Sequence, residues 1–244
     1  PLVTVPVDLA APSGAGGGGR AVVPGLVTAR EAPLSPRLRP SCGRCRYTVG
    51  MAISFFLASQ SPRRRELLTQ AGFAFALLPV AVEETPAANE RGLEYVRRVV
   101  GDKLDAALRL RPAPRPVLVA DTEVLLDGRA LGKPADRNAA AETLAALAGR
   151  THQVISRVAV ADDTRREAVE SVTEVDFAPL TAAQIRRYCD SDAPLGKAGS
   201  YAIQGEAAGF VRAMRGSLTG VIGLPVVETT TLLAAFGVRP EEIA

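Results

Sequence analysis

Apolar and polar positions alternate along most of the chain, with two different spacings. Short apolar runs bounded by turn residues predict strands over Ile53–Ala58, Phe75–Leu78, Val117–Asp121, Gln153–Val160, Val169–Phe177 and Gly209–Arg215. Apolar residues at helical spacing predict helices over Pro62–Ala71, Leu93–Leu110, Asn138–Ala148, Thr181–Cys189 and Val226–Phe236. This alternation predicts an α/β domain with a mixed sheet and flanking helices. Only the polar turn over 162–166 separates the fourth and fifth strands, so we expect them to form an antiparallel hairpin.

The first 50 residues lack this pattern. They hold 15 of the 40 Gly and Pro residues and show no sustained apolar periodicity, which predicts a disordered or non-native extension over 1–50. We expect the domain to occupy 51–244, with Met51 as the functional start. The alternative for the extension is an organellar transit peptide, since it contains Arg and few acidic residues. Its Cys42 and Cys45 have no second pair to complete a zinc site, so we interpret them as incidental.

Composition excludes several classes of protein. No uncharged apolar run approaches the roughly 20 residues that span a bilayer, so we expect a soluble, cytoplasmic protein without a membrane partner. One His and three Cys among 244 residues are too few for a His-based triad or a multi-His metal centre, so any metal must sit mainly on carboxylate oxygens. Residues 51–244 hold 23 basic and 24 acidic side chains, and this balance argues against a nucleic-acid partner.

The basic residues are strongly biased toward Arg. Of 29 Lys and Arg residues only three are Lys, namely Lys103, Lys133 and Lys197. A compact ammonium on a flexible stem differs chemically from a planar guanidinium. These three positions are therefore candidates for sites where the ammonium itself is needed.

A first candidate site follows the opening strand. In the segment Ser59-Gln60-Ser61-Pro62-Arg63-Arg64, Ser61 suits a helix N-cap and Pro62 the first helical position. Free backbone amides, the positive end of the helix dipole and the guanidiniums of Arg63 and Arg64 favour an anion such as a triphosphate. The alternative is a capped surface helix with solvated Arg side chains.

Acidic residues provide the second set of candidates. Asp121 and Thr122 follow an apolar run, and a carboxylate at the end of a buried strand lies where open α/β sheets bind ligands. Lys133, between Gly132 and Pro134, could offer a point charge to a phosphate. Glu84 could add an oxygen ligand for Mg²⁺ or Mn²⁺. Each has a simpler alternative as a turn or surface residue.

The Gly-rich segment over 194–205 and the single His complete the candidates. Lys197 lies in this segment, and the Gln204 amide can both donate and accept, as reading a base edge requires. The alternative is an ordinary loop. His152 has no Cys or His near it in sequence, so we expect a structural, hydrogen-bonded histidine.

In order and spacing, these segments resemble the Maf family of nucleoside triphosphate pyrophosphatases. The resemblance extends from about Met51 to Gly237. The matching stretches are LASQSPRRRELL (57–68), VEE (82–84), the DK pair of the long helix (102–103), VADTEVLLDGRALGKPAD (119–136), GRTHQV (149–154), PLGKAGSYAIQG (194–205) and VIGLPVVET (221–229). All three Lys residues fall inside these stretches, which supports the resemblance independently.

The resemblance implies a two-lobed fold with a central cleft, similar to that of inosine triphosphatase, and attack of water on the α-phosphorus of a nucleotide with a divalent cation, Mg or Mn. It implies that Asp121 is the proton acceptor and that Asp121 and Glu84 are the cation ligands. The phosphates would lie among Arg63, Arg64, Lys103 and Lys133. Ser59 and Lys197 are further substrate-binding candidates, and Arg64, Thr122 and Gln204 are candidates for base selection.

The loop sequence resembles the branch that acts on dTTP and UTP. Gly196 stands where that branch usually has Asp, and Gly220 where Asn is common. A 7-methyl-GTP specificity, modified pyrimidine nucleotides or a non-catalytic regulator of septation are the alternatives. The expected partner is the nucleoside triphosphate, and a homodimer is an open expectation.

Overall fold

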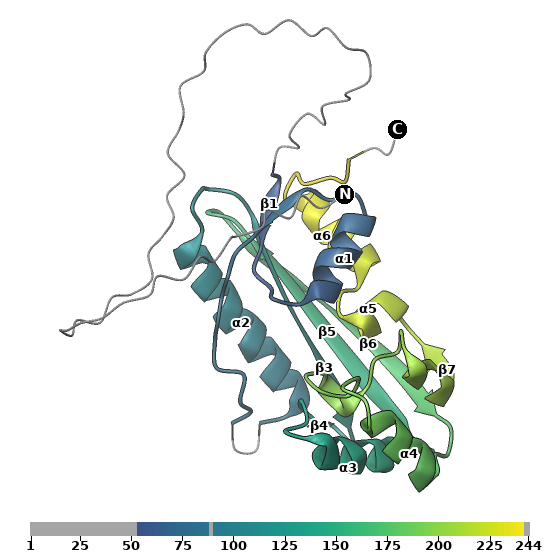
Figure 1. The fold of residues 1–244 in the computed structure, drawn as a ribbon. Coiled ribbons are helices and arrows are strands. Elements are labelled where there is room, and N and C mark those ends of the chain that lie inside the picture. The colour runs from purple at the N-terminus through teal and green to yellow at the C-terminus, as the bar shows by residue number, and fades with distance from the viewer. Residues whose placement is uncertain (1–52, 88–89, 242–244) are drawn as a thin grey trace, which may run out of the picture. The chain divides into compact units, whose positions relative to one another are not determined.

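The computed structural model describes residues 53–87 and 90–241 (Figure 1). The expected extension over 1–50, the start at Met51, and Cys42 and Cys45 lie outside these residues. Seven strands form one mixed sheet in the order β2-β1-β3-β5-β6-β7, with β4 paired to the end of β3. The strands are β1 (Phe55–Leu57), β2 (Phe75–Leu77), β3 (Val117–Leu126), β4 (Arg129–Ala130), β5 (Thr151–Ala161), β6 (Arg166–Phe177) and β7 (Val211–Arg215). The predicted fold class is confirmed.

Helices cover both faces of the sheet. They are α1 (Pro62–Gln70), α2 (Gly92–Leu110), α3 (Arg137–Leu147), α4 (Ala182–Cys189), α5 (Leu218–Ile222) and α6 (Val226–Ala235), with short 3₁₀ helices η1 (Ala198–Ser200) and η2 (Glu206–Phe210). The long helix α2 packs along β3 and β5 on one face, while α1, α5 and α6 lie on the other (Figure 1). β4, α5 and the 3₁₀ helices were not predicted, because segments this short contain too few positions for a period.

The predicted hairpin is confirmed. β5 and β6 pair antiparallel over their full length, with Arg157 opposite Glu170 near the middle. The turn closes through the Asp162 carboxylate, which accepts hydrogen bonds from the backbone of Thr164 and Arg165. A polar turn thus holds the two longest strands in register.

The strand predicted to end at Asp121 continues to Leu126, so the prediction was wrong at that end. A charged residue interrupts the apolar run, but antiparallel pairing with β5 extends over Val117–Leu125 and keeps the backbone extended. On the opposite edge, β1 pairs only with 117 and 118, and β4 with 125 and 126. Among the described residues, 119–123 therefore have no strand partner on that edge. This gap in pairing leaves room for a cavity.

Two separate apolar cores on one sheet face account for the two-lobed form. Leu118 and Ala120 pack in the core with α1 and α6, whereas Val124 and Leu126 pack in the core with α3 and α4. Between them lies Thr122, with its hydroxyl 2.7 Å from that of Ser156 on β5. Because alternate residues of a strand share a face, one polar position is enough to divide the apolar surface in two. No helix in the described ranges is long and apolar enough to cross a membrane.

Candidate active site

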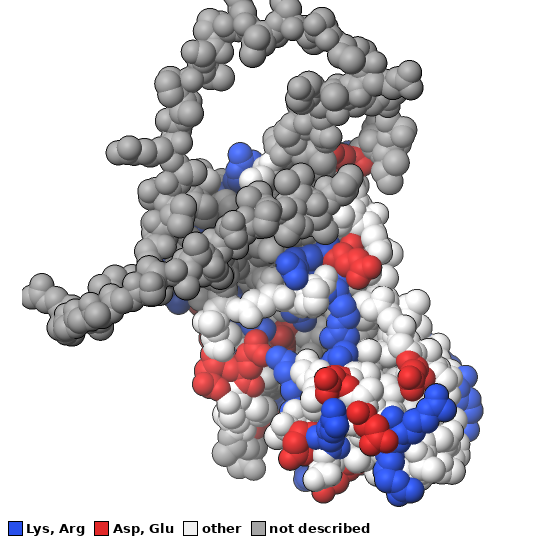
Figure 2. Space-filling model, viewed as in Figure 1, with Lys and Arg blue, Asp and Glu red and all other residues white. Residues whose placement is uncertain are grey.

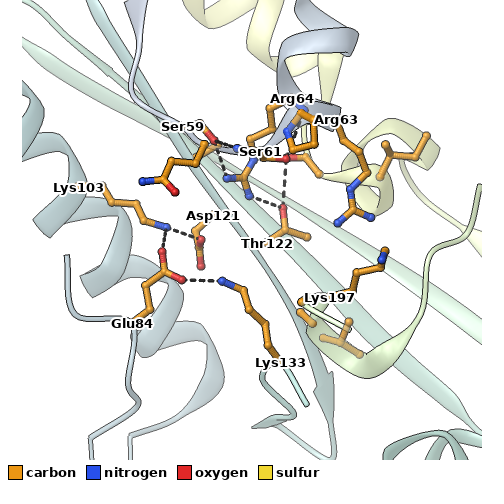
Figure 3. A pocket seen from close by; sticks show the side chains of 18 of the residues that line it. Ser59, Ser61, Arg63, Arg64, Glu84, Lys103, Asp121, Thr122, Lys133 and Lys197 are labelled. Atoms are coloured by element: carbon orange, nitrogen blue, oxygen red, sulfur yellow. Dashed lines mark hydrogen bonds and ion pairs between the residues drawn. The ribbon is translucent and has the colours of Figure 1, made fainter. Parts of the chain in front are cut away.

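A cavity of about 420 Å³ opens at the unpaired edge of β3 (Figure 3). This volume is within the range of small-ligand sites. Its walls come from the end of β1, the start of α1, α2 and the segment before it, β3, β5, the loop after β4, the loop before η1 and the end of α5. The lining includes Ser59, Ser61, Arg63, Arg64, Glu84, Lys103, Asp121, Thr122, Lys133 and Lys197.

Two carboxylates and two lysines form a connected cluster on the α2 side. Lys103 Nζ lies 2.7 Å from Glu84 Oε1 and 2.8 Å from Asp121 Oδ1, so one ammonium bridges both acids. Lys133 Nζ lies 2.7 Å from Glu84 Oε2. Burial opposes ionisation of Glu84, but the hydrogen bonds from both lysines outweigh it and lower its pKa to about 2. Both lysines thus hold Glu84 charged.

Helix α2 fixes the segment that carries Glu84. The buried Tyr95 hydroxyl donates to the Glu84 carbonyl at 2.6 Å, and Arg98 donates to the Thr85 carbonyl at 3.0 Å. Tyr95 and Arg98 are three residues apart, so they are neighbours on the surface of α2. Tyr95 and Arg98 were not predicted as site residues, because their partners are backbone atoms of another segment.

Arg64 connects three segments at the opposite wall. It donates to the Gly223 carbonyl (2.8 Å), Ser59 Oγ (3.2 Å) and Thr122 Oγ1 (3.3 Å). Burial lowers the pKa of Arg64, and the charge of Asp121 partly offsets this. Thr122 in turn contacts Ser156, which donates to the Gly220 carbonyl at 2.7 Å. Ser156 is fully buried and was not a predicted site residue.

The start of α1 is built as expected. Ser61 precedes Pro62 and caps the helix by accepting from the Arg64 amide. Arg63 extends from this turn toward Lys197 (Figure 3). In the described ranges neither side chain forms an ion pair with an acid. Burial lowers the pKa of Lys197, and the nearby Arg63 lowers it further. Two neighbouring cations without acidic partners favour an anion between them.

His152 and Gln204 lie outside the cavity lining. Gln204 is exposed, so the structure does not bring it to the other predicted residues. His152 is buried, as expected for a structural histidine, and its Nε2 lies 2.8 Å from the hydroxyl of Tyr201, which does line the cavity. Burial lowers the pKa of His152 to about 4, which keeps the ring neutral at pH 7.

Glu123 is a further acidic residue that sequence analysis did not identify. Its side chain is 4% exposed, and its Oε1 accepts from the amides of Val124 (2.8 Å) and Gly132 (3.1 Å). Burial raises its pKa to about 7, although the two backbone hydrogen bonds act in the opposite direction. A charged residue inside an apolar strand pattern was the one available signal.

The cavity suits a polyanion together with hydrolytic chemistry. Its lining has five cationic side chains and two carboxylates. The exposed surface shown in Figure 2 has Lys and Arg next to acidic residues around a hollow. In the described part of the chain, no group of three or more His, Cys, Asp or Glu side chains is placed to hold a metal ion. A cation here would therefore need oxygens from the ligand as well.

The family model and the relatives found by sequence comparison agree with one another. A family model described as Maf-like protein matches residues 54–236. A "dTTP/UTP pyrophosphatase" from Pectobacterium atrosepticum is 46% identical over 181 residues, covering 74% of this chain and 92% of that protein. One of the same name from Salmonella typhimurium is 48% identical over 183 residues, covering 75% and 93%. Another from Bordetella avium is 46% identical over 191 residues, covering 75% and 95%. Among solved structures, a nucleoside-triphosphatase, dITP/XTP pyrophosphatase from Mycobacterium abscessus aligns with 74% of this chain and 97% of its own at 16% identity and a TM-score of 0.35.

Proposed function

Because the chain belongs to the Maf family, we propose that it hydrolyses dTTP and UTP to the monophosphate and pyrophosphate. The observation that supports this most directly is the cavity itself, in which a lysine-bridged pair of carboxylates faces a wall of cations. The cationic excess suits a triphosphate. The relatives that bear the name dTTP/UTP pyrophosphatase support the choice of base.

Water attacks the α-phosphorus in the proposed reaction, and the bond from that phosphorus to the oxygen bridging to the β-phosphorus breaks. Asp121 accepts the proton of the attacking water. Lys103 holds one oxygen of Asp121, which fixes the orientation of the carboxylate. Lys133, Arg63 and Lys197 offset the charge that develops on the departing pyrophosphate.

Glu84 and Asp121 fit a divalent cation of the Mg²⁺ or Mn²⁺ type. Their hard carboxylate oxygens approach the same ammonium from two segments, and Mg²⁺ is commonly held by one or two carboxylates plus substrate phosphates. When bound, such an ion polarises the phosphoryl oxygens and neutralises their charge. This cation, a cytoplasmic location, the homodimer and base selection by Arg64 and Thr122 are parts of the same proposal.

The test is pyrophosphate release from a panel of dTTP, UTP, dCTP, dATP, dGTP, GTP, ITP and 7-methyl-GTP with Mg²⁺ and with Mn²⁺. We expect the highest kcat/KM for dTTP and UTP, with monophosphate and pyrophosphate formed in equal amounts. A preference for 7-methyl-GTP would contradict the substrate assignment. Hydrolysis of none of them would favour the non-catalytic regulator, and release of inorganic phosphate would place the broken bond elsewhere.

A further inference from the structure

Glu123 is buried beside the cavity but does not line it. It lies on the same strand face as Asp121, two residues further along β3, where α2 covers the sheet. A buried carboxylate is costly unless its oxygens receive hydrogen bonds. The burial of the Glu123 carboxylate therefore has to be explained by the groups that it contacts.

The side-chain hydrogen bonds of Glu123 lie at the unpaired edge of β3, opposite its pairing with Ile155 of β5. Its Oε1 accepts from the Val124 amide at 2.8 Å and from the Gly132 amide at 3.1 Å. The Val124 carbonyl accepts from the Leu131 amide at 2.9 Å. The carboxylate thus takes the place of a strand partner where the chain returns from β4.

Gly132 connects this carboxylate to both lysine-bearing loops. The residue after it is Lys133, and its own carbonyl accepts from the Gly199 amide at 3.0 Å. Gly199 belongs to η1, which Lys197 precedes as the N-cap residue. One continuous series of hydrogen bonds therefore extends from Glu123 through Gly132 to the loop of Lys197.

Both glycines have positive φ angles, a backbone conformation that favours glycine. Gly132 has φ +65°, and no heavy atom lies within 4 Å of a Cβ built on it. Gly199 has φ +67° and is pressed against Val124. Hydrogen bonds hold the backbone of Gly132 in the loop after β4, while the neighbouring Leu131 packs against the core of α3 and α4.

We propose that Glu123 is a positioning residue, which sets the loops of Lys133 and Lys197 against the cavity by accepting the Gly132 amide. Glu123 touches no substrate in this arrangement and acts through the backbone of Gly132. The kinetic part of the test rests on the proposed function, whereas the amide-exchange part does not.

The test compares Glu123→Gln, which keeps an acceptor oxygen of the same reach, with Glu123→Met, which fills the volume without one. In amide hydrogen exchange followed by NMR, we expect Gly132 and Gly199 to exchange at least roughly tenfold faster in Glu123→Met, with β5 amides unchanged. In Glu123→Gln both amides should stay near wild type. Unchanged protection of Gly132 in Glu123→Met, or equally fast exchange throughout the sheet, would overturn the proposal.

The kinetic part uses dTTP hydrolysis and a double-mutant cycle with Lys133→Ala. Glu123→Met should lower kcat roughly tenfold in the wild-type background and less than about twofold in Lys133→Ala, because its main effect passes through Lys133. In Glu123→Gln, which keeps the acceptor oxygen, kcat should stay near that of wild type. Equal losses in both backgrounds would overturn the proposal.

Thr229→Val removes a buried hydroxyl hydrogen bond in α6 and serves as the control for loss of stability alone. Its kcat should match wild type. If wild type hydrolyses no nucleotide, the proposed function fails, while the exchange result still decides the role of Glu123.

Discussion

Asp121 lies between an ammonium that neutralises it and the cavity where a triphosphate would bind. In Asp121→Asn the amide keeps the shape but cannot take a proton, so we expect kcat to fall by roughly 10² to 10⁴. Metal-free binding of dTTP should hold or tighten, because Lys103 loses one of its two acidic partners and a like charge near the phosphates disappears. Pyrophosphate release measures kcat, and calorimetric titration with dTTP measures the affinity.

Asp127→Asn is the matched control, since Asp127 is exposed in the turn after β3 and pairs only with the exposed Arg150 in the described structure. Its kcat and dTTP affinity should be those of wild type. Unchanged kcat in Asp121→Asn would contradict its role as proton acceptor.

His152 makes stability depend on pH in a defined window. Its pKa is about 4 in the folded protein and near 6.5 in an unfolded chain, so the unfolded state binds more protons between these values. The free energy of unfolding is therefore lost as pH falls from 6.5 to 4, by on the order of 3 kcal/mol in full. In His152→Gln, which does not titrate, this part of the loss should be absent.

Urea unfolding of both proteins at pH 7.5, 5.5 and 4.5 checks this expectation. The wild type should lose its advantage over His152→Gln as the pH falls, while titrating carboxylates affect both proteins alike. A constant difference between them across the series would show that His152 ionises equally in the folded and unfolded states.

At the level of elements, η1 depends on one close approach to β3. A Cβ on Gly199 would lie 2.7 to 2.9 Å from three atoms of the Val124 side chain, and φ is +67°. In Gly199→Ala we expect the free energy of unfolding to fall by about 1–2 kcal/mol through backbone strain and by a further 1–3 kcal/mol through overpacking. Displacement of η1 should also raise KM through Lys197. Urea unfolding and dTTP kinetics measure the two effects.

Gly196→Ala separates strain from packing. Gly196 has nearly the same φ, +68°, but no heavy atom lies within 4 Å of a Cβ built there. In Gly196→Ala the free energy of unfolding should therefore fall only by the amount due to backbone strain. Equal destabilisation by the two substitutions would mean that contact with Val124 does not hold η1 in place.

At the level of the whole molecule, the residues that line the cavity lie within a continuous portion of the chain. The residues that line the cavity fall between Ala58 and Gly223, and the matched family region is 54–236. A protein without residues 1–50 should therefore keep its thermal midpoint and a kcat/KM within about twofold of wild type.

A longer deletion, of residues 1–60, serves as the comparison with the deletion of residues 1–50. It deletes β1, whose Phe55 and Leu57 are fully buried in the core, so we expect no cooperative unfolding transition. Loss of activity already in the shorter deletion would show that the extension contributes to the enzyme.

The sequence by itself determined most of the elements and the charged residues that line the cavity. Caps such as Ser61 before Pro62, hydrophobic periods and turns are interactions between near neighbours, so they are visible in a short stretch of chain. An acid after an apolar run, a neighbouring glutamate and the scarcity of Lys singled out Asp121, Glu84 and the three lysines, all of which the structure brings to one cavity.

Only the tertiary structure decided what holds these side chains in place. Tyr95, Ser156 and Glu123 act on backbone atoms of segments that are distant in sequence or in another element, and Gln204 faces solvent although its motif predicted a base contact. The end of β3 likewise depended on pairing with β5 rather than on its own residues. Partners of polar groups and strand length are set by long-range contacts, which no local pattern contains.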